Sequence, residues 1–438
     1  MPAFTTDADR AGEFIYDWND DASSARRAEQ DGRPRAAGVV DETLRDGLQN
    51  PSVVDPPIED KLRILHRMEE LGIDDANIGL PGSSPRAFDD ALRLCREVVQ
   101  CRMKIRISAA GRTVLGDITP MIEISQRTGL RLEVCAFIGS SPIRQYVERW
   151  DVALIARRSS EAIDVAVRAG LPVTYVTEDT TRSRPDALET LFRSALDHGA
   201  TRLVLSDTVG HATPEGVRAL LAFTKRVVAS TGHTAGIDWH GHNDRGLALS
   251  NALLALDCGA DRVHGTALGI GERVGNAPIE LLLLNLHLSG RLAPSGNVAG
   301  ARTPDRDLTK LVSYCEEVAR AVGWTVPPNY PLVGRDAFRT TTGVHAAAIV
   351  KALELGDAWL VDRVYSSVPA GTFGRSQEIG IGFMSGASNV NYWLRTRGID
   401  PNDALVVAIL HAAKARSRTM TEDEVMTVVE SMRPGPAR

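Results

Sequence analysis

The sequence predicts an α/β protein, a (β/α)8 TIM barrel followed by a smaller, mainly α-helical C-terminal region. Eight short runs rich in apolar and β-branched residues recur along the chain, a helical pattern follows each run, and the alternation ends near residue 292. The runs cover residues 37–44, 74–81, 103–110, 131–138, 172–177, 202–207, 236–242 and 262–267. An open, doubly wound sheet would show the same alternation. The barrel makes a further demand, because its chemistry should lie at the C-terminal ends of the strands.

Several of the helical patterns have recognisable start and stop signals. Ser84 and Thr213 each place a hydroxyl group before a proline, which suits the N-cap and the first position of a helix. Asp55, which precedes two prolines, is expected to cap the helix that ends at Gly72 in the same way. These signals place helices between consecutive strands, as a barrel requires.

The composition divides the chain into three parts. Residues 1–36 are polar and rich in Asp, Arg and Ala, so we expect a loosely packed N-terminal extension. Residues 37–292 form the predicted barrel, and the following segment, SGNVAGARTPDRD, has the composition of a linker. Residues 300–438 contain further helical patterns, near 307–322, 344–354, 387–397, 402–414 and 421–432. We expect this region to pack on the mouth of the barrel and to contribute to the active site.

The overall composition is that of a soluble globular protein. The chain has 438 residues, 43% hydrophobic and 24% charged, with a formal net charge of −6, which favours neither a nucleic-acid nor a membrane partner. Acidic substrates must then be bound by a few local arginines or by a metal. The five cysteines include no CxxC pair, and no apolar run has the length of a signal peptide or a membrane helix. These features predict a cytoplasmic protein with reduced thiols.

A cluster of metal-binding side chains is predicted at the barrel mouth. Asp46 lies just past the first strand, and His240 and His242 end the seventh, where residues at i and i+2 point to the same face. Asn276 follows the eighth strand and could add a carbonyl oxygen. Two imidazoles and a carboxylate at strand ends favour a site for one divalent ion, with Mn, Mg, Zn and Co all compatible. Three other histidines lack such partners and are expected to be structural: His211, His233 and His264.

Further polar residues end other strands. Arg45 could neutralise an enolate or alkoxide beside the metal. Glu178 and Thr208 end the fifth and sixth strands, where they suit proton transfer and carboxylate binding, although Glu178 with Asp179 could instead cap the next helix. For Asp244 two roles stay open, since it could accept the second N–H group of a metal-bound histidine or cap the following helix.

Three motifs occur in a fixed order between residues 38 and 290: DETLRDG, HGHNDRGLA and GTALGIGERVGNAPIE. Together they resemble the DRE-TIM metallolyase superfamily, which includes 2-isopropylmalate, citramalate, homocitrate and Re-type citrate synthases and 3-hydroxy-3-methylglutaryl-CoA (HMG-CoA) lyase. The synthase branch is more similar, because the loop LGIGERVGN lacks the catalytic cysteine that the lyase carries there. The three glycines of this loop could approach the phosphates of CoA, but a tight βα turn explains them as well.

The resemblance implies a Claisen condensation of acetyl-CoA with a 2-oxo acid, followed by hydrolysis of the thioester to a 2-substituted malate-type product. It assigns Asp46, His240, His242 and Asn276 to the metal, Arg45 and Glu178 to catalysis, and Gln49, Arg112 and Thr208 to substrate binding. The segment TGVHAAAIVKA resembles the synthase segment that carries an acid/base histidine, which would be His345, with Tyr365 as its partner. In such synthases these residues reach the neighbouring subunit, which implies a homodimer.

The sequence also departs from the family pattern. Asn77 stands where the family usually has a glutamate, Met384 replaces a histidine, and Thr174 replaces the arginine that binds 2-oxoglutarate in homocitrate synthases. The segment SSPIR resembles the SSxxLR of homocitrate synthases, so Arg144 could bind an acidic tail of another kind. We therefore expect a specialised acidic 2-oxo acid such as oxaloacetate or phosphonopyruvate. Because the chain ends where many isopropylmalate synthases continue into a leucine-sensing domain, feedback control through such a domain is not expected.

Other functions compete with the synthase hypothesis. A lyase of the HMG-CoA type would cleave a carbon–carbon bond in an acyl-CoA, but it would favour a cysteine in the last loop. Two histidines and a carboxylate also occur in non-haem iron oxygenases, which normally use an all-β scaffold. A barrel that serves only in binding is the third alternative, and the intact set of Arg45 and metal ligands argues against it.

Overall fold

A computed structural model describes residues 7–19, 37–292, 296–298, 301–303 and 306–432 of the chain. The chain divides into two compact units. The barrel unit comprises Arg35–Val326, and the C-terminal unit comprises Pro327–Arg438 together with Met1–Pro34. The barrel unit therefore extends beyond the boundary near residues 292–300 that the composition suggested.

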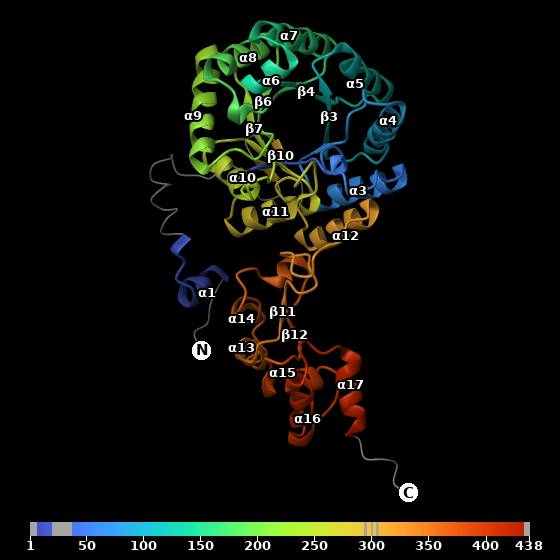
Figure 1. Cartoon of the computed structure of the whole chain (residues 1–438), viewed down its shortest axis with the longest axis vertical. Coiled ribbons are helices and arrows are strands. Elements are labelled where there is room, and N and C mark those ends of the chain that lie inside the picture. Colours follow the sequence, from blue (N-terminus) through green and yellow to red (C-terminus); the bar gives the residue numbers. More distant parts are fainter. Residues whose placement is uncertain (1–6, 20–36, 293–295, 299–300, 304–305, 433–438) are drawn as a thin grey trace. The chain divides into compact units, whose positions relative to one another are not determined.

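Eight parallel strands close into a barrel in sequence order, each pairing with its neighbours and β8 pairing with β1 (Figure 1). The strands are β1 (Gly38–Asp41), β2 (Asp75–Asn77), β3 (Arg106–Arg112), β4 (Glu133–Gly139), β5 (Val173–Glu178), β6 (Arg202–Asp207), β7 (Gly236–Gly241) and β8 (Arg262–Gly265). Each lies within or next to a predicted run, and the (β/α)8 barrel is confirmed. The alternation of apolar runs with helical patterns thus predicted the parallel strands, and the grouping of polar residues at strand ends favoured the closed barrel over an open sheet.

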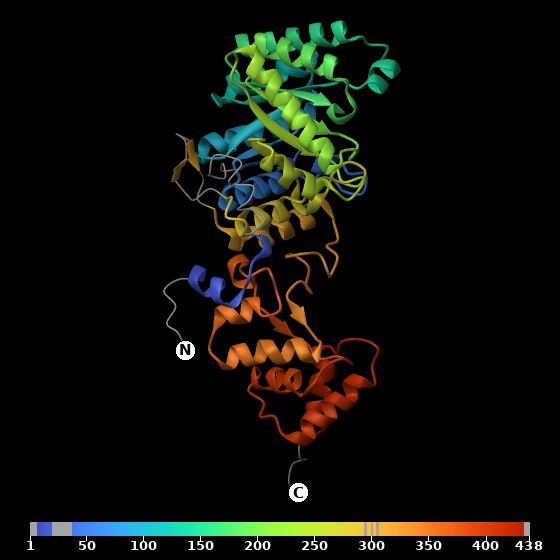
Figure 2. The same ribbon diagram turned by 90° about the vertical axis from the view of Figure 1, so that its left-hand side faces the viewer.

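A ring of helices surrounds the strands, as Figure 1 shows in end view and Figure 2 from the side. The helices are α3 (Ile58–Leu71), α4 (Pro85–Gln100), α5 (Leu115–Thr128), α6 (Pro142–Glu148), α7 (Val152–Arg168), α8 (Pro185–Asp197), α9 (Pro214–Thr231), α10 (Ala248–Asp257) and α11 (Ile279–Leu288). Short 3-10 turns follow three of the strands: η1 (Gly47–Gln49), η2 (Thr180–Arg182) and η3 (Ala267–Gly269). The apolar faces of the surrounding helices are buried and supply the main hydrophobic stabilisation of the barrel. In α3, for example, Ile64, Leu65 and Met68 are fully buried.

Four predicted helix signals can be compared with the backbone. The Ser84 and Thr213 hydroxyls accept hydrogen bonds from amides in the first turns of α4 and α9, as predicted. Gly72 ends α3 in the left-handed conformation, with φ of 75°. The expected cap at Asp55 is wrong, because its carboxylate forms an ion pair with Lys61 and the helix begins without a side-chain cap.

Helix α12 (Leu311–Val322) belongs to the barrel unit and packs against α3. Its residue Tyr314 is fully buried, and its hydroxyl donates a hydrogen bond to Asp41 Oδ2 at the end of β1. The same hydroxyl lies 3.1 Å from Oγ1 of Thr43, which in turn accepts a hydrogen bond from the amide of Ala267. The buried Tyr314 hydroxyl therefore links α12 to β1 and, through Thr43, to the segment that follows β8.

The interior of the barrel contains a buried ionic cluster. The guanidinium of Arg262, in β8, lies 3.2 Å from Asp75 of β2, 2.8 Å from Glu133 of β4 and 2.8 Å from Asp238 of β7. Since these side chains come from four strands around the barrel, they can meet only inside it. Arg106 pairs with Asp75 and Arg202 pairs with Asp238, each at 2.6 Å, so the cluster contains three guanidinium groups and three carboxylates. This local balance of charge is the condition for burying such groups. This cluster lies beneath the strand ends that carry the candidate site.

The C-terminal unit is mainly helical, with one short two-stranded sheet. It contains α13 (Gly343–Glu354), α14 (Ala358–Arg363), α15 (Ala387–Arg395), α16 (Asp403–Lys414) and α17 (Glu422–Ser431), and the strands β11 (Arg339–Thr340) and β12 (Glu378–Ile379). The last three helices share an apolar core that includes Val390, Ile409 and Val425. Part of the predicted N-terminal extension is helical, α1 (Asp7–Phe14), and the ring of Phe14 lies 6.2 Å from that of Trp359. The predicted linker contributes a small hairpin, β9 (Gly296–Val298) and β10 (Ala301–Thr303), within its described residues.

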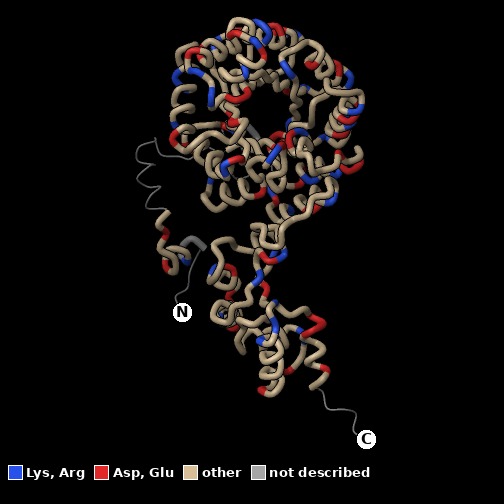
Figure 3. Tube along the Cα trace, viewed as in Figure 1, with Lys and Arg blue, Asp and Glu red and all other residues tan. Residues whose placement is uncertain are grey.

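Acidic and basic side chains are interspersed along both units (Figure 3). Among the residues that the structure describes, no helix combines the length and the hydropathy needed to cross a bilayer.

Candidate active site

Three predicted metal ligands converge at the C-terminal ends of β1 and β7. Nε2 of His240 lies 3.5 Å from Oδ2 of Asp46, and Nε2 of His242 lies 3.4 Å from the same oxygen. All three side chains are buried, and their ligand atoms lie within 4.8 Å of one another. Two imidazoles and one carboxylate in this arrangement can hold a divalent ion.

Asn276 completes the cluster from the loop after β8. Its Nδ2 donates a hydrogen bond of 3.1 Å to Asp46 Oδ1, which also accepts from the amide of Glu272. The Oδ1 atom of Asn276 is buried and has no hydrogen-bond partner. A buried oxygen without a partner carries a desolvation cost, and a cation would remove that cost. The residues therefore fit a divalent metal with mixed nitrogen and oxygen ligands.

The orientation of His242 is set by a backbone carbonyl. Its Nδ1 donates a hydrogen bond of 2.6 Å to the carbonyl of Thr208, which leaves Nε2 directed at Asp46. Asp244 fills neither of the roles considered for it, because its carboxylate pairs with Arg273 at 3.0 Å. The side chain of Asn243 instead accepts the amide hydrogen bond at the start of α10.

The protonation states also suit metal binding. Burial lowers the pKa of His240 to about 3, so its imidazole is neutral at pH 7 and has a free lone pair. Burial alone would raise the pKa of Asp46, but the Arg45 guanidinium and a hydrogen bond from His242 hold it well below its usual value. Asp46 is therefore a carboxylate.

Arg45 is the cation nearest to this cluster. Its Nη1 lies 3.0 Å from Asp46 Oδ2, and its Nε and Nη2 contact the carboxylate of Glu42. The side chain is 17% exposed, which places a positive charge in a poorly hydrated environment. There it can stabilise negative charge that develops on a substrate oxygen.

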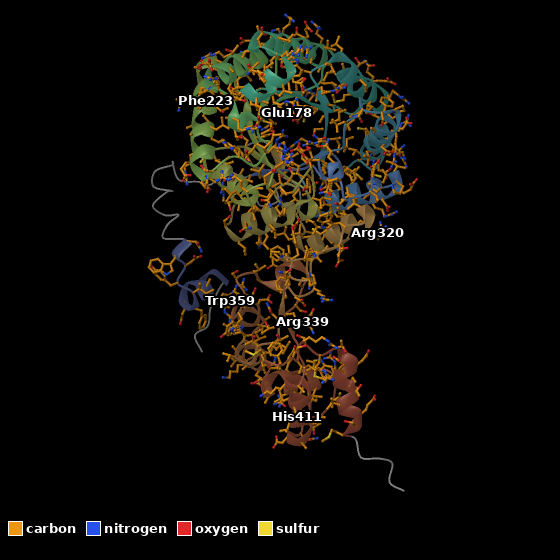
Figure 4. All side chains as sticks on the ribbon, viewed as in Figure 1. Glu178, Phe223, Arg320, Arg339, Trp359 and His411 are labelled. Atoms are coloured by element: carbon orange, nitrogen blue, oxygen red, sulfur yellow. The ribbon has the colours of Figure 1, made fainter. Side chains whose placement is uncertain are left out.

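A cavity of about 210 Å³ opens above the cluster. It is lined by seven of the predicted site residues: Arg45, Asp46, Gln49, Glu178, Thr208, His240 and His242. Figure 4 labels Glu178 on the inner side of the ring of helices. Burial raises the pKa of the Glu178 carboxyl, so it retains its proton to a higher pH than an exposed glutamate does. The carboxylate of its neighbour Asp179 pairs with Arg182 and does not cap the next helix.

Five predicted residues are not among those that line this cavity: Asn276, described above, and Arg112, Arg144, His345 and Tyr365. The guanidinium of Arg112 pairs with Asp117 at 2.8 Å. Arg144 Nη2 lies 3.9 Å from Glu178, and its Nε is buried without a partner. His345 and Tyr365 belong to the C-terminal unit, where their rings stack with centroids 4.2 Å apart.

Glu42 and His264 are among the cavity-lining residues that were not predicted from the sequence. The expectation that His264 lacks partners is wrong, because its Nδ1 donates a hydrogen bond of 2.8 Å to Glu42 Oε1. Burial would raise the pKa of Glu42, but Arg45 and His264 lower it to about 2. No local sequence signal marks this pair, because it depends on the register that sets Val40 opposite His264, and Glu42 lies one residue past the end of β1.

The glycine-rich loop 268–276 approaches the cluster closely. A Cβ atom at Gly275, where φ is 86°, would lie 1.8 Å from the carbonyl oxygen of Gly269. A Cβ atom at Gly271 would lie 2.1 Å from Nδ2 of Asn276 and 3.0 Å from Asp46. The tight turn and its approach to Asp46 thus account for these glycines.

Comparison with known proteins places the chain among enzymes. Residues 37–318 match the HMGL-like family. A Methanopyrus kandleri protein assigned as an (R)-citramalate synthase is 30% identical over 92% of this chain and 74% of its own length. The homocitrate synthase of the same organism is 29% identical over 90% of this chain and 92% of its own length. The 2-isopropylmalate synthase of Pyrococcus furiosus is 33% identical over 72% of this chain, which matches 61% of that enzyme.

Solved structures share the barrel. The HMG-CoA lyase of Bacillus subtilis superposes with a TM-score of 0.53, at 21% identity, over 67% of this chain and 96% of that protein. The HMG-CoA lyase of Brucella melitensis gives a TM-score of 0.52, at 21% identity, over 65% of this chain and 98% of that protein. At these identities the likeness concerns the fold.

Proposed function

Because this chain belongs to the HMGL-like family, we propose that it is an acyl-CoA:2-oxo acid acyltransferase that condenses acetyl-CoA with a 2-oxo acid and hydrolyses the thioester. One observation carries the proposal. Asp46, His240 and His242 are buried and line one cavity with Arg45 and Glu178, and the amide of Asn276 donates a hydrogen bond to Asp46. The relatives whose names give an activity are citramalate, homocitrate and 2-isopropylmalate synthases.

The metal ligands and Arg45 act on the keto group of the 2-oxo acid. A divalent ion held by Asp46, His240, His242 and Asn276 would supply a Lewis acid for that group. Arg45 stabilises the negative charge that forms on the keto oxygen as the new carbon–carbon bond is made. Thr208 and Gln49 orient the substrate carboxylate. The Thr208 oxygen already accepts a hydrogen bond from the amide of Asp179, so its hydroxyl proton is available to the substrate.

The proposed proton-transfer groups are Glu178 and the pair formed by His345 and Tyr365. One of these groups removes a proton from the acetyl methyl group, which then attacks the keto carbon. Water hydrolyses the resulting thioester and releases CoA, so the overall reaction runs in one direction. Following the family resemblance, we propose that His345 and Tyr365 serve the neighbouring subunit of a homodimer.

The preferred 2-oxo acid is proposed to carry a second acidic group. Arg144 lies outside the cavity lining, with Nη2 3.3 Å from Glu148 and 3.9 Å from Glu178, and it has an unpaired buried N–H group. It could bind a distal carboxylate or phosphonate if the guanidinium turned from Glu148 toward the cavity. Arg112 could assist only after leaving Asp117. Thr174 donates its hydroxyl to Glu133, and it is not among the residues that line the cavity. Oxaloacetate and phosphonopyruvate are therefore the first candidates to test.

The test is CoA release from acetyl-CoA, followed with a thiol reagent, against a panel of 2-oxo acids. The panel includes pyruvate, 2-oxoisovalerate, 2-oxoglutarate, oxaloacetate and phosphonopyruvate, each with Mn²⁺, with Mg²⁺ and with EDTA. We expect release that depends on one 2-oxo acid and stops with EDTA. No release with any of them, together with cleavage of an acyl-CoA such as HMG-CoA, would replace the synthase with a lyase.

A further inference from the structure

Glu42 lines the cavity and lies between Arg45 and His264, which both donate hydrogen bonds to its carboxylate. Its Oε2 accepts hydrogen bonds from Nε and Nη2 of Arg45, and its Oε1 accepts one of 2.8 Å from Nδ1 of His264. The side chains of Glu42 and His264 are only 3% and 6% exposed. Both carboxylate oxygens of Glu42 are thus occupied, and its position is fixed from two sides.

The far side of His264 is anchored in the ionic cluster of the barrel interior. Its Nε2 lies 3.5 Å from Asp238, which accepts hydrogen bonds of 2.9 Å from Arg262 and 2.6 Å from Arg202. A continuous chain of buried polar contacts therefore runs from the rigid strands β6, β7 and β8 through His264 and Glu42 to the guanidinium of Arg45.

We propose that Glu42 and His264 are positioning residues, which hold the Arg45 guanidinium so that Nη1 faces Asp46 and the cavity while Nε and Nη2 are engaged on Glu42. This inference rests on the proposed function, because it assigns Arg45 to the reacting oxygen. A free arginine side chain loses rotamer entropy when it is fixed. A guanidinium that is already fixed before substrate binds can stabilise developing charge without that cost.

Glu42 has a second consequence for the metal ligands. The two carboxylates that contact Arg45 are Glu42 and Asp46. Without the negative charge of Glu42, as in Glu42→Gln, the Arg45 guanidinium would be free to turn toward Asp46. It would then compete with a cation for the Asp46 carboxylate. Glu42 thus keeps Asp46 available as a ligand.

The test compares four proteins: the wild type, Glu42→Gln, Arg45→Gln and the double variant. If Glu42 acts through Arg45, Glu42→Gln lowers kcat about 10–100-fold in the wild-type background, with a smaller change in KM. In the Arg45→Gln background the same change should cost less than about 3-fold, because the positioned group is gone. An equal loss in both backgrounds would overturn the proposal, since a purely structural role of Glu42 does not depend on Arg45.

The role of His264 is tested by a conservative rescue. His264→Asn keeps a donor near the position of Nδ1, whereas His264→Ala removes it. We expect kcat of the Asn variant to exceed that of the Ala variant by about 10-fold or more, at matched melting temperatures. Equal kcat values for the two variants would remove His264 from the chain of contacts.

A binding measurement separates this inference from the proposed function. If the wild type releases no CoA with any 2-oxo acid, the function fails while the geometry around Arg45 stays testable. Calorimetric titration with Mn²⁺ should then show weaker binding in Glu42→Gln than in the wild type, and a smaller difference between the two Arg45→Gln proteins. Equal differences in both backgrounds would overturn the positioning role.

Discussion

Replacing Tyr314 by Phe tests how α12 is tied to the barrel. The change removes one hydroxyl group and leaves the packing of the ring in place. That hydroxyl is the donor to Asp41 Oδ2, and the Asp41 carboxyl is fully buried. Its other oxygen accepts the amide of Thr43 and is unaffected. The variant therefore removes the hydrogen bond from α12 to Asp41, together with the 3.1 Å contact between the same hydroxyl and Thr43 Oγ1.

The magnitude follows from the state of Asp41. Burial raises the pKa of Asp41 to about 6, even though hydrogen bonds from Thr43 and Tyr314 lower it. At pH 7 the carboxyl is largely ionised, and loss of the donor should cost about 1–3 kcal/mol of unfolding free energy. The same loss raises the folded-state pKa further above the unfolded value, so ionisation costs the folded state more. As the pH falls through 6, Asp41 becomes protonated in both proteins and the penalty shrinks.

The assay is urea unfolding followed by tryptophan fluorescence at pH 7 and pH 5, with Tyr146→Phe as the control. Tyr146 lies in α6 and is 85% exposed, so its hydroxyl should contribute nothing measurable at either pH. We expect Tyr314→Phe to be destabilised more at pH 7 than at pH 5. A variant that matches the wild type within about 0.5 kcal/mol at both pH values would refute the role given to this hydrogen bond.

Three further predictions concern the site. His240→Ala should abolish both calorimetric Mn²⁺ binding and CoA release while the circular dichroism spectrum is unchanged, and retention of either would remove His240 from the metal site. Because burial raises the pKa of Glu178, kcat/KM should rise with pH, with a midpoint above the usual pKa range of glutamate. Glu178→Gln should remove this rise, and a pH profile that the substitution leaves unchanged would exclude Glu178 as the base. Gly275→Ala should weaken Mn²⁺ binding about 10-fold or more, since the new Cβ collides with the carbonyl of Gly269 and displaces the adjoining Asn276. Gly116→Ala, which meets nothing within 4 Å, is the matched control and should bind Mn²⁺ as the wild type does.

The sequence was sufficient for the barrel because its signals are local. Each buried parallel strand is a short β-branched run, and each helix is announced by a capping hydroxyl such as Ser84 or by a terminal glycine such as Gly72. The cluster of Asp46 with His240 and His242 was also predictable, since strand ends in a barrel converge on one face.

What the sequence could not show depends on contacts between distant strands. The pairing of Glu42 with His264 needs the closure of β1 on β8, which joins residues 222 positions apart. The contact of α12 with β1 likewise depends on tertiary packing, and it groups α12 with the barrel in the compact unit that ends at Val326. For Asp244 the sequence allowed two roles, and the structure shows a third, an ion pair with Arg273.

The ionic cluster inside the barrel also bears on how this sequence can change over evolutionary time. Arg262 is shared among Asp75, Glu133 and Asp238, so a substitution at any one position leaves an uncompensated charge in the interior. A single substitution at any of these four positions is therefore expected to lower stability. Lineages that abandon the arrangement must change several of them together, and the four residues should covary as a group while the helices outside them diverge freely.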